Sequence, residues 1–433
     1  MNKYKVSLWH GLSLGLVLGL ALWTAPSFAQ TDQRPAPFED IEAKINDGMA
    51  PFIGLNREYG EIIHDKQNHV TDKAAQQLQM RQNGKLDDNK LIISGQGVGT
   101  ALYEKTNTDG KFPILSRIPN THTKKDRGHE LIVQDAQLGF TATLPYTTLY
   151  AQGEYLDNIY KGQEKTQWRK YFVTIGDLDV APVYLSFGKK TVSFGDFSSY
   201  APFTHNHGAH YFWAQNNDDP LFELGYLDHG WHATASLIKN DRGLRVVNSP
   251  EGENGYENFA LNVSKKWMLG SGDAIKFGGG FLRGTIYDGS LAHHPPVIGS
   301  SDRDWNGAWD ANITYNAGNF DLNAEFARTL DEWPATDAHV HSLTLQGRYF
   351  DYIYDFPVTY SLMFSEGRQG NSGDEWFHMM QTVAGFEMRV HPNVRFGLEY
   401  LNNIDFVPLI MPRFTADDGV VSHTLQAGVK ITF

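Results

Sequence analysis

The feature that most restricts the fold of this chain is a two-residue alternation of apolar and polar side chains, repeated from Leu91 to the C-terminus. It is clearest in the last segment, where one face carries Val421, Leu425, Ala427, Val429, Ile431 and Phe433, with His423 as its only polar member. The opposite face carries Ser422, Thr424, Gln426, Gly428, Lys430 and Thr432. Successive side chains of a strand point to opposite faces, so the segment is predicted to be a strand with one lipid-compatible and one wet face.

The same pattern predicts a membrane protein without membrane helices. No apolar run after residue 30 approaches the length of a membrane-spanning helix, whereas Gly (42) and Tyr (20) are abundant. Inside a bilayer every backbone N–H and C=O must be paired within the protein, so strands can cross only as a closed barrel. The fold class predicted is therefore all-β, a transmembrane antiparallel barrel of the outer-membrane kind that occupies residues 91–433.

The alternating segments number about sixteen, an even count that leaves both ends of the barrel on the periplasmic side. They are Leu91–Leu102, Leu131–Leu144, Thr147–Leu156, Arg169–Leu178, Val183–Val192, Leu221–Leu227, Trp231–Ile238, Glu257–Trp267, Asp273–Ile286, Ala308–Asn316, Phe320–Leu330, Val340–Tyr352, Val358–Ser365, Phe377–Val390, Val394–Leu401 and Val420–Phe433. Tight turns and long polar loops alternate between them, which is typical of bacterial barrels. A terminal Phe433 that closes the last strand resembles the assembly signal of outer-membrane barrels.

The N-terminus predicts export. Lys3 and Lys5 precede an apolar run from Val6 to Trp23, and Ser27-Phe28-Ala29 follows, so residues 1–29 are expected to be a signal peptide cleaved after Ala29. A retained membrane anchor is the alternative, but no charged stop-transfer cluster follows the run. The chain has no cysteine, which excludes disulfides, thiolate metal sites and a lipid-modified N-terminal cysteine.

Residues 30–90 are polar and do not alternate, and they are expected to form a periplasmic N-terminal extension. Phe38–Met49 and Asp72–Gln82 are predicted to be short helices, the second with Thr71 as its N-cap, and His64–Val70 is predicted to be a loop. The extension is either mobile or folded partly into the barrel mouth, and the sequence leaves both options open.

The charged side chains of the alternating strands are expected to face the lumen, because a charge facing lipid costs roughly 2–4 kcal/mol at the midplane. The candidates for a lumen lining are Asp321, Glu325, Glu387, Arg389, Arg395, Glu399 and Lys430. The alternative is that these groups only brace and solvate the barrel. The formal charge is −13, or −15 once Lys3 and Lys5 are removed, so we expect a mild preference for cations and no nucleic-acid partner.

One segment resembles a known family. The hairpin Tyr171–Asp179 turns through Ala181-Pro182 into Pro182–Gly188, and Phe194-Gly195-Asp196-Phe197-Ser198-Ser199-Tyr200 follows it. This stretch resembles the LbtU-type siderophore porins of Gram-negative bacteria, as do the exported N-terminus, the polar extension and the length. The resemblance implies uptake of a ferric siderophore through a porin-like barrel without a TonB-coupled plug, and it supplies no ligand motif.

The loop at 193–220 is a candidate constriction. A sixteen-stranded barrel leaves an aqueous channel, whereas the plugged transporters need about 22 strands. Porins of this size commonly fold one loop inward, and this loop offers Phe194, Phe197, Tyr200, Phe203, Tyr211 and Trp213 for packing inside the barrel. An external flap is the alternative, because alternation does not locate a loop.

Other chemistry has weaker support in the sequence. His205, His207 and His210 are weak candidates for a metal site, since imidazoles bind transition metals but no carboxylate accompanies them at a fixed spacing. No Gly-x-Ser-x-Gly motif occurs, so no enzymatic activity is expected and no cofactor is assigned, although an outer-membrane hydrolase is the alternative from another class. A general or carbohydrate diffusion porin is the alternative within the channel class.

The expected location is the outer membrane of a Gram-negative bacterium. The partners expected there are a ferric siderophore or another small solute, outer-membrane lipid and lipopolysaccharide, and the barrel-assembly machinery. A homotrimer is one option for the assembly.

Overall fold

The computed structural model describes residues 52–115, 125–157, 164–210, 212–213, 218–239, 256–270, 272–287, 305–334, 336–373, 377–406 and 417–433. The predicted signal peptide and the predicted helix Phe38–Met49 lie outside the described residues.

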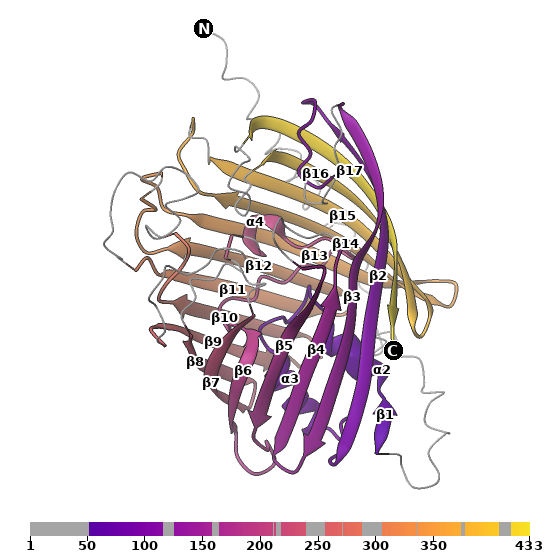
Figure 1. Cartoon of the computed structure of the whole chain (residues 1–433), viewed down its shortest axis with the longest axis vertical. Coiled ribbons are helices and arrows are strands. Elements are labelled where there is room, and N and C mark those ends of the chain that lie inside the picture. The colour runs from indigo at the N-terminus through magenta and orange to yellow at the C-terminus, as the bar shows by residue number, and fades with distance from the viewer. Residues whose placement is uncertain are drawn as a thin grey trace.

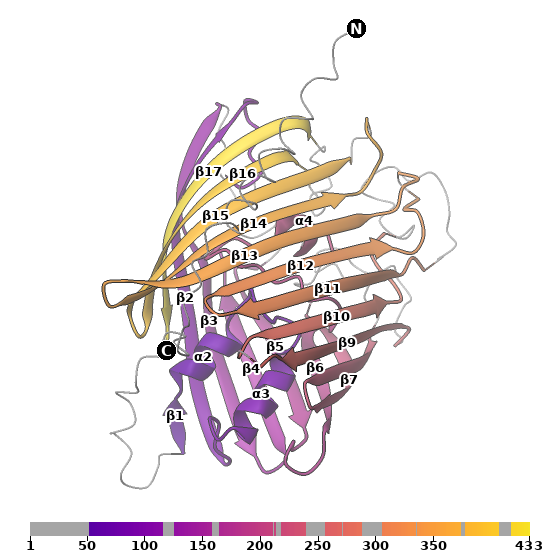
Figure 2. The ribbon, with the colours of Figure 1, turned by 180° about the vertical axis from the view of Figure 1, so that it is seen from behind.

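Sixteen antiparallel strands form one closed barrel (Figures 1 and 2), in agreement with the predicted fold class. They are β2 (Lys90–Thr106), β3 (Arg127–Leu144), β4 (Thr147–Tyr155), β5 (Thr166–Ile175), β6 (Val183–Thr191), β7 (Asp218–Asp228), β8 (Trp231–Ile238), β9 (Asn258–Met268), β10 (Ala274–Leu282), β11 (Ala308–Ala317), β12 (Phe320–Thr329), β13 (His341–Ile353), β14 (Phe356–Arg368), β15 (His378–His391), β16 (Val394–Phe406) and β17 (Asp417–Thr432). Each strand pairs with the next, and β17 pairs with β2 to close the ring. Each of these sixteen strands therefore has a hydrogen-bonded neighbour on both sides.

Short turns join the strands at one end of the barrel. Three of them place a non-glycine residue at positive φ, namely Tyr146 (62°), His229 (46°) and Tyr354 (54°), as tight hairpin turns require. One predicted strand starts earlier than expected: the reversal before β14 uses Tyr354-Asp355, and the strand begins at Phe356 rather than at Val358. Short turns mark the periplasmic side of bacterial barrels, so we assign this end to the periplasm.

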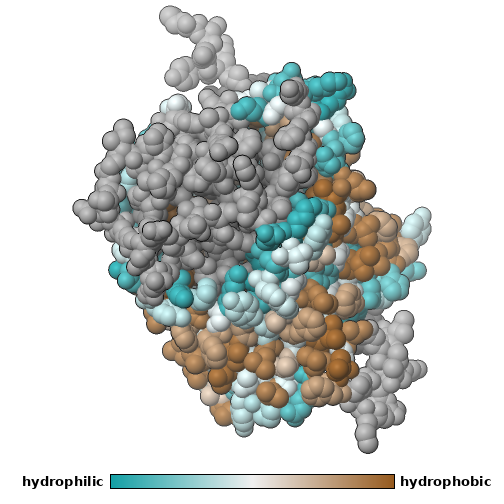
Figure 3. Space-filling model, viewed as in Figure 1, coloured by the Kyte–Doolittle hydropathy of each residue, from teal (hydrophilic) through white to brown (hydrophobic). Residues whose placement is uncertain are grey.

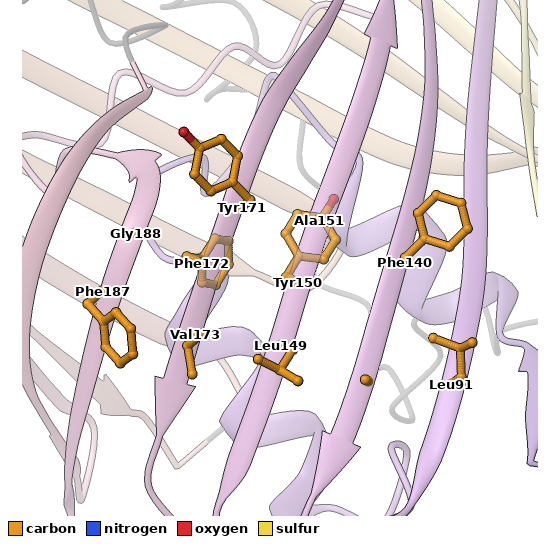
Figure 4. Close-up of a pocket in the computed structure, with 11 residues that line it drawn as sticks. Leu91, Phe140, Leu149, Tyr150, Ala151, Tyr171, Phe172, Val173, Phe187 and Gly188 are labelled. Carbon is orange, nitrogen blue, oxygen red and sulfur yellow. The ribbon is translucent and has the colours of Figure 1, made fainter.

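The outer wall is apolar. Leu322, Phe396 and Leu398 are each 46–48% exposed, and they alternate with the polar residues of the inner wall. Apolar side chains cover much of the visible barrel surface toward the short-turn end (Figure 3). A depression of about 430 Å³ on this wall crosses β2 to β6 and is lined almost entirely by carbon, from Leu91, Phe140, Ala142, Leu149, Tyr150, Ala151, Tyr171, Phe172, Val173, Phe187 and Gly188 (Figure 4). Such a surface requires a lipid environment. Among the described residues, no helix is long and apolar enough to span a membrane.

The residues that precede the barrel fold back into its interior and pack against the inner wall. Strand β1 (Ile53–Leu55) pairs in parallel with the start of β2, and helices α2 (Arg57–Ile63) and α3 (Lys73–Gln82) follow, at the short-turn end (Figure 2). Helix α3 matches the predicted helix, but its N-cap is Asp72 rather than Thr71, whose hydroxyl instead donates to the Asp72 carboxylate. Helix α2 was not predicted.

The inner wall is polar and yet buried. Glu399 and Gln381 have no exposed surface, although both lie on the face of the sheet opposite to the lipid. The reason is that other parts of the same chain fill the lumen: residues 52–89, here called the N-terminal segment, and residues 192–213, here called the inner loop.

Candidate functional site: the occupied lumen

The inner loop crosses the barrel interior and is bound to the opposite wall. On β12, the carboxylate of Glu325 accepts the backbone N–H of Asp196 at 2.7 Å and that of Phe197 at 2.6 Å. On β16, Glu399 accepts the backbone N–H groups of Phe203 and Thr204, the second at 3.1 Å. Two lumen candidates are thus anchors for loop backbone, because a buried carboxylate is stable only when its oxygens are hydrogen-bonded.

Amides and hydroxyls on neighbouring strands continue this attachment. Gln346 of β13 accepts the backbone N–H of Tyr200 at 2.8 Å and donates to the carbonyl of Ser198 at 2.8 Å. Trp213 donates its indole N–H to Ser342 at 2.7 Å. The loop contains a short helix, α4 (His207–His210), which packs against β13, β14 and β15.

Glycines on the inner wall make room for the loop. A Cβ added at Gly385 would lie 2.5 Å from Pro202, and one added at Gly397 would lie 2.5 Å from the ring of Phe203. A Cβ atom does not tolerate contacts below 3.0 Å, so the inner loop can approach β15 and β16 this closely only because these positions have no side chain.

The predicted constriction residues have different places. Phe194, Phe197 and Trp213 pack on one another, and Trp213 also packs on Tyr287, with ring centroids 5.7–6.5 Å apart. Together they belong to a small apolar core inside the barrel. Phe203 is buried against the glycines of β16 and β17. Tyr200 lines a cavity described below, and Tyr211 lies outside the described residues.

The N-terminal segment is bound to the inner loop. The backbone N–H of Ser199 donates to the carbonyl of Gln67 at 2.7 Å, and the Gln67 amide donates to the carbonyl of Ala201 at 2.7 Å. The Thr71 hydroxyl donates to the carbonyl of Gly195 at 3.4 Å. The segment and the loop therefore form one continuous obstruction from the short-turn end to the middle of the lumen.

Four of the five remaining lumen candidates form a charged cluster against α2. Glu61 lies 2.9 Å from Arg389 and 2.7 Å from Arg395, and Glu387 lies 3.3 Å from Arg395 and 3.5 Å from Lys430. Asp321 pairs separately with Arg348 at 2.8 Å. Glu61 was not among the sequence candidates, because it precedes the region that alternates.

His64 is a second buried anchor of the N-terminal segment. Its Nε2 lies 2.9 Å from the hydroxyl of Ser94 and its Nδ1 lies 3.1 Å from the amide oxygen of Gln137. Burial lowers the pKa of His64 to about 4, because the protonated ring would lose its hydration. Gly139 of β3 leaves space for the ring, since a Cβ there would lie 2.7 Å from it.

The contact between Ser94 and His64 bears on the hydrolase alternative. In a catalytic triad the second ring nitrogen of the histidine meets a carboxylate and the serine is open to substrate. Here that nitrogen meets an amide, Ser94 has no exposed surface and His64 is 1% exposed. The pair therefore serves to dock the N-terminal segment on the wall.

Polar cavities remain beside the obstruction, along β9 to β13. One of about 460 Å³ is lined by Asn68, His69, Asp196, Ser198, Tyr200, Lys266, Lys276, Thr314, Asn316, Gly318, Asn319, Asp321, Arg348 and Phe350. An adjoining cavity of about 610 Å³ shares His69, Lys266 and Lys276 with it. It reaches Asp228 at the end of β7 and Gly230 in the turn that follows. The cavities therefore open toward the short-turn end and are the space in which a solute can be accommodated.

Arg348 is a half-buried donor on the wall of the smaller cavity, with 26% of its side chain exposed. Its guanidinium lies 4.3 Å from the ring centre of Tyr200 and 5.2 Å from that of Phe350, while its Nε donates to Asp321. Stacking and pairing fix the plane of the guanidinium, which leaves it oriented to bind carboxylate or other acceptor oxygens.

The ionic preference expected from the sequence needs revision. It presumed free carboxylates at Asp321, Glu325, Glu387 and Glu399, and each of these is bound to a cation or to backbone N–H groups. The smaller cavity is lined by three cationic side chains, Lys266, Lys276 and Arg348, against the carboxylates of Asp196 and Asp321.

The adjoining cavity adds the carboxylates of Asp72, Asp179 and Asp228, so the combined lining has mixed charge. We therefore expect Arg348→Gln, which removes a cation from the smaller cavity, to shift the ionic preference toward cations. The measurement is the reversal potential of the channel in a planar bilayer under a salt gradient. An unchanged reversal potential in the variant would contradict the expectation.

The histidines of the inner loop do not form a metal centre in the part of the chain that the structure describes, where no group of three or more His, Cys, Asp or Glu side chains is placed to hold an ion. Nδ1 of His207 lies 2.9 Å from the Gln381 amide, which fixes the ring to β15. The side chain of His210 lies outside the described residues, and His205 is buried to an intermediate degree.

Comparison with known proteins supports the fold. No protein-family model and no curated protein matches the sequence. OmpF of Salmonella typhi, in complex with daunomycin, is similar with a TM-score of 0.53 at 15% identity, over 79% of this chain and 98% of that chain. The outer membrane channel DcaP of Acinetobacter baumannii has a TM-score of 0.51 at 13% identity, over 79% and 97%. An anion-selective porin from Comamonas acidovorans has a TM-score of 0.51 at 12% identity, over 79% and 99%.

Likeness at these identities shows the fold alone. The chain has the fold of the outer-membrane porins, and its closed barrel with an apolar outer wall places it in the outer membrane of a Gram-negative bacterium.

Proposed function

We propose that this chain is a porin-like channel that admits a ferric siderophore without a TonB-coupled plug domain. The observation that carries the channel class is the closed sixteen-stranded barrel with a polar inner wall and polar cavities beside the inner loop. The siderophore is supported by the family resemblance, whose residues fall on the hairpin of β5 and β6 and on the inner loop from Phe194 to Tyr200.

The lumen chemistry is compatible with this cargo. Ferric chelates are bulky and rich in acceptor oxygens, and Arg348 and Lys276 offer charged donors beside the aromatic ring of Tyr200. An unselective diffusion porin fits less well, because the N-terminal segment and the inner loop fill space that such a channel would leave open.

The test is uptake of a labelled ferric siderophore by a deletion strain on iron-limited medium, complemented with the native gene or with Arg348→Gln. The deletion is expected to lower uptake, the native gene to restore it, and the variant to restore it only in part. If uptake in the deletion strain equals that of the parent while entry of small sugars or amino acids falls, the siderophore is the wrong cargo and the diffusion porin is favoured.

Three partners stay predictions: lipopolysaccharide at the outer surface, the assembly machinery at Phe433, and further copies of the chain in a homotrimer. Phe433 exchanges two backbone hydrogen bonds with Gly95, at 2.9 and 3.0 Å, and so lies at the seam where β17 meets β2.

A further inference from the structure

Three cations stand side by side on the inner wall near the short-turn end. Arg389 of β15 is directly opposite Arg395 of β16 in the strand register, and Arg395 is directly opposite Lys430 of β17. Like charges in directly opposed positions destabilise a sheet, so this row needs anions to be stable. The wall supplies one, Glu387, which pairs with Arg395 and Lys430.

The second anion comes from outside the wall. Oε2 of Glu61, on helix α2, lies 2.9 Å from Nη2 of Arg389 and 2.7 Å from Nη2 of Arg395, and Arg57 of the same helix holds the other oxygen at 3.1 Å. The carboxylate thus bridges two arginines of the barrel in the way that a bound carboxylate ligand does.

We propose that the row Arg389, Arg395 and Lys430 is a binding site for carboxylate-bearing solutes, and that Glu61 occupies it as an internal competitor while the lumen is closed. A solute carboxylate that binds the two arginines displaces Glu61 and weakens the docking of the N-terminal segment. The inference rests on the proposed channel function and adds to it a chemical class of ligand and a means of opening.

Two further observations favour the displacement of Glu61 by a solute carboxylate at this site. The five side chains of the cluster keep 13–24% of their surface exposed, so a small anion can reach them without prior unfolding. The N-terminal segment continues from Glu61 directly through His64 to Gln67, which is bound to the inner loop, so release of α2 acts on the whole obstruction. A ligand shifts such an equilibrium only by its differential affinity for the two states, and the two arginines are free of the competing Glu61 carboxylate only in the released state.

The experiment uses the full chain in planar bilayers and compares the native protein with Glu61→Gln. The probe is glutarate, which carries the carboxylate of a glutamate side chain, and the matched neutral probe is glutaramide. The matched control variant is Glu58→Gln, because Glu58 lies on the same helix and pairs with Lys85, away from the wall. Loss of the charged contacts is expected to raise the open probability of Glu61→Gln roughly tenfold or more. Glutarate should open the native channel in a saturable manner, and glutaramide should not.

A second readout keeps the inference separate from the channel function. Because the chain lacks cysteine, Ala74→Cys introduces a single thiol on α3 at a position that is 1% exposed. Maleimide labelling of this thiol is expected to accelerate with glutarate and with Glu61→Gln, whether or not the protein conducts. Unchanged labelling and unchanged conductance in both cases would overturn the inference. Faster labelling in a protein that never conducts would instead support the anion site and contradict the channel function.

Discussion

Replacing Glu325 and Glu399 together by glutamine is expected to detach the inner loop and raise the single-channel conductance several-fold. Glu325 accepts one backbone N–H group of the loop on each of its oxygens, so a glutamine would direct an NH₂ donor at one of them. At Glu399 one oxygen accepts both backbone N–H groups and the other accepts the Thr204 hydroxyl, so a glutamine keeps these partners but loses the strength that the negative charge gives to the hydrogen bonds. The loss is about 2 kcal/mol at Glu325, or roughly 30-fold in the ratio of attached to detached loop, and about 1 kcal/mol at Glu399. Removing a buried charge also removes a desolvation penalty, but the opposed donor at position 325 leaves the exchange unfavourable overall.

The measurement is single-channel recording in planar bilayers, with Glu164→Gln as the control because Glu164 is an exposed residue of a loop between β4 and β5. The two single variants should give intermediate conductance, since their anchors lie on different strands, β12 and β16. If the double variant conducts like the native protein, the loop is held by other contacts and these carboxylates are not its anchors.

The barrel was predictable because each strand leaves a local signal. Two-residue alternation persists for eight or more residues in most strands, and one face must be apolar wherever the other side is lipid. Each of the sixteen predicted segments overlaps one of the strands β2 to β17, although several strands, such as β16, extend beyond the predicted bounds. The early start of β14 has a physical cause: Pro357 favours a turn in the sequence, whereas a proline is also tolerated at the start of a strand.

The occupation of the lumen was less predictable, because it depends on partners far apart in the chain. Alternation assigned Glu325 and Glu399 to the inner face, but their partners lie 129 and about 195 positions away. A two-residue period gives the face of a side chain and not the group that it meets. For the same reason, the sequence left the choice between bracing and solute contact open.

Helix α2 and the surface that contacts the inner loop were not predicted, although both leave a signal in the sequence. Helix α2 has only seven residues, but Asn56 precedes it as an N-cap that accepts from Tyr59, and Glu58 lies in the first turn. Gly385 and Gly397 interrupt strands whose other inner positions carry side chains, and an isolated glycine inside a strand indicates close approach of another segment. These signals locate a helix and a contact surface, but not the segment that covers it.

Acidification from pH 7 to pH 4.5 is expected to release the N-terminal segment through His64. Burial lowers the pKa of docked His64 to about 4, whereas a released histidine has its ordinary pKa of about 6.5. Between these values the released segment binds a proton that the docked one does not, so docking weakens as the pH falls. The full effect at pH 4 is about 3 kcal/mol, and none of it is present above pH 6.5, where the ring is neutral in both states.

Neighbouring carboxylates do not cancel this effect. Burial by itself would raise the pKa of Asp65, but Lys73, Lys430 and hydrogen bonds to the carboxylate lower this pKa overall. The contribution of Asp65 to docking is therefore lost only as the pH falls below the range in which His64 acts. The other charged groups near His64 are Asp135, which favours protonation, and Lys73, which opposes it.

The measurement is the rate of maleimide labelling of Ala74→Cys as a function of pH, divided by the rate for Asp87→Cys, an exposed position of the same segment. The ratio corrects for ionisation of the thiol, and it should rise as the pH falls from 6.5 to 4.5. His64→Gln retains hydrogen-bonding groups toward Ser94 and Gln137 but does not titrate in this range, so its ratio should stay flat. An equally steep rise in His64→Gln would assign the acid response to another group.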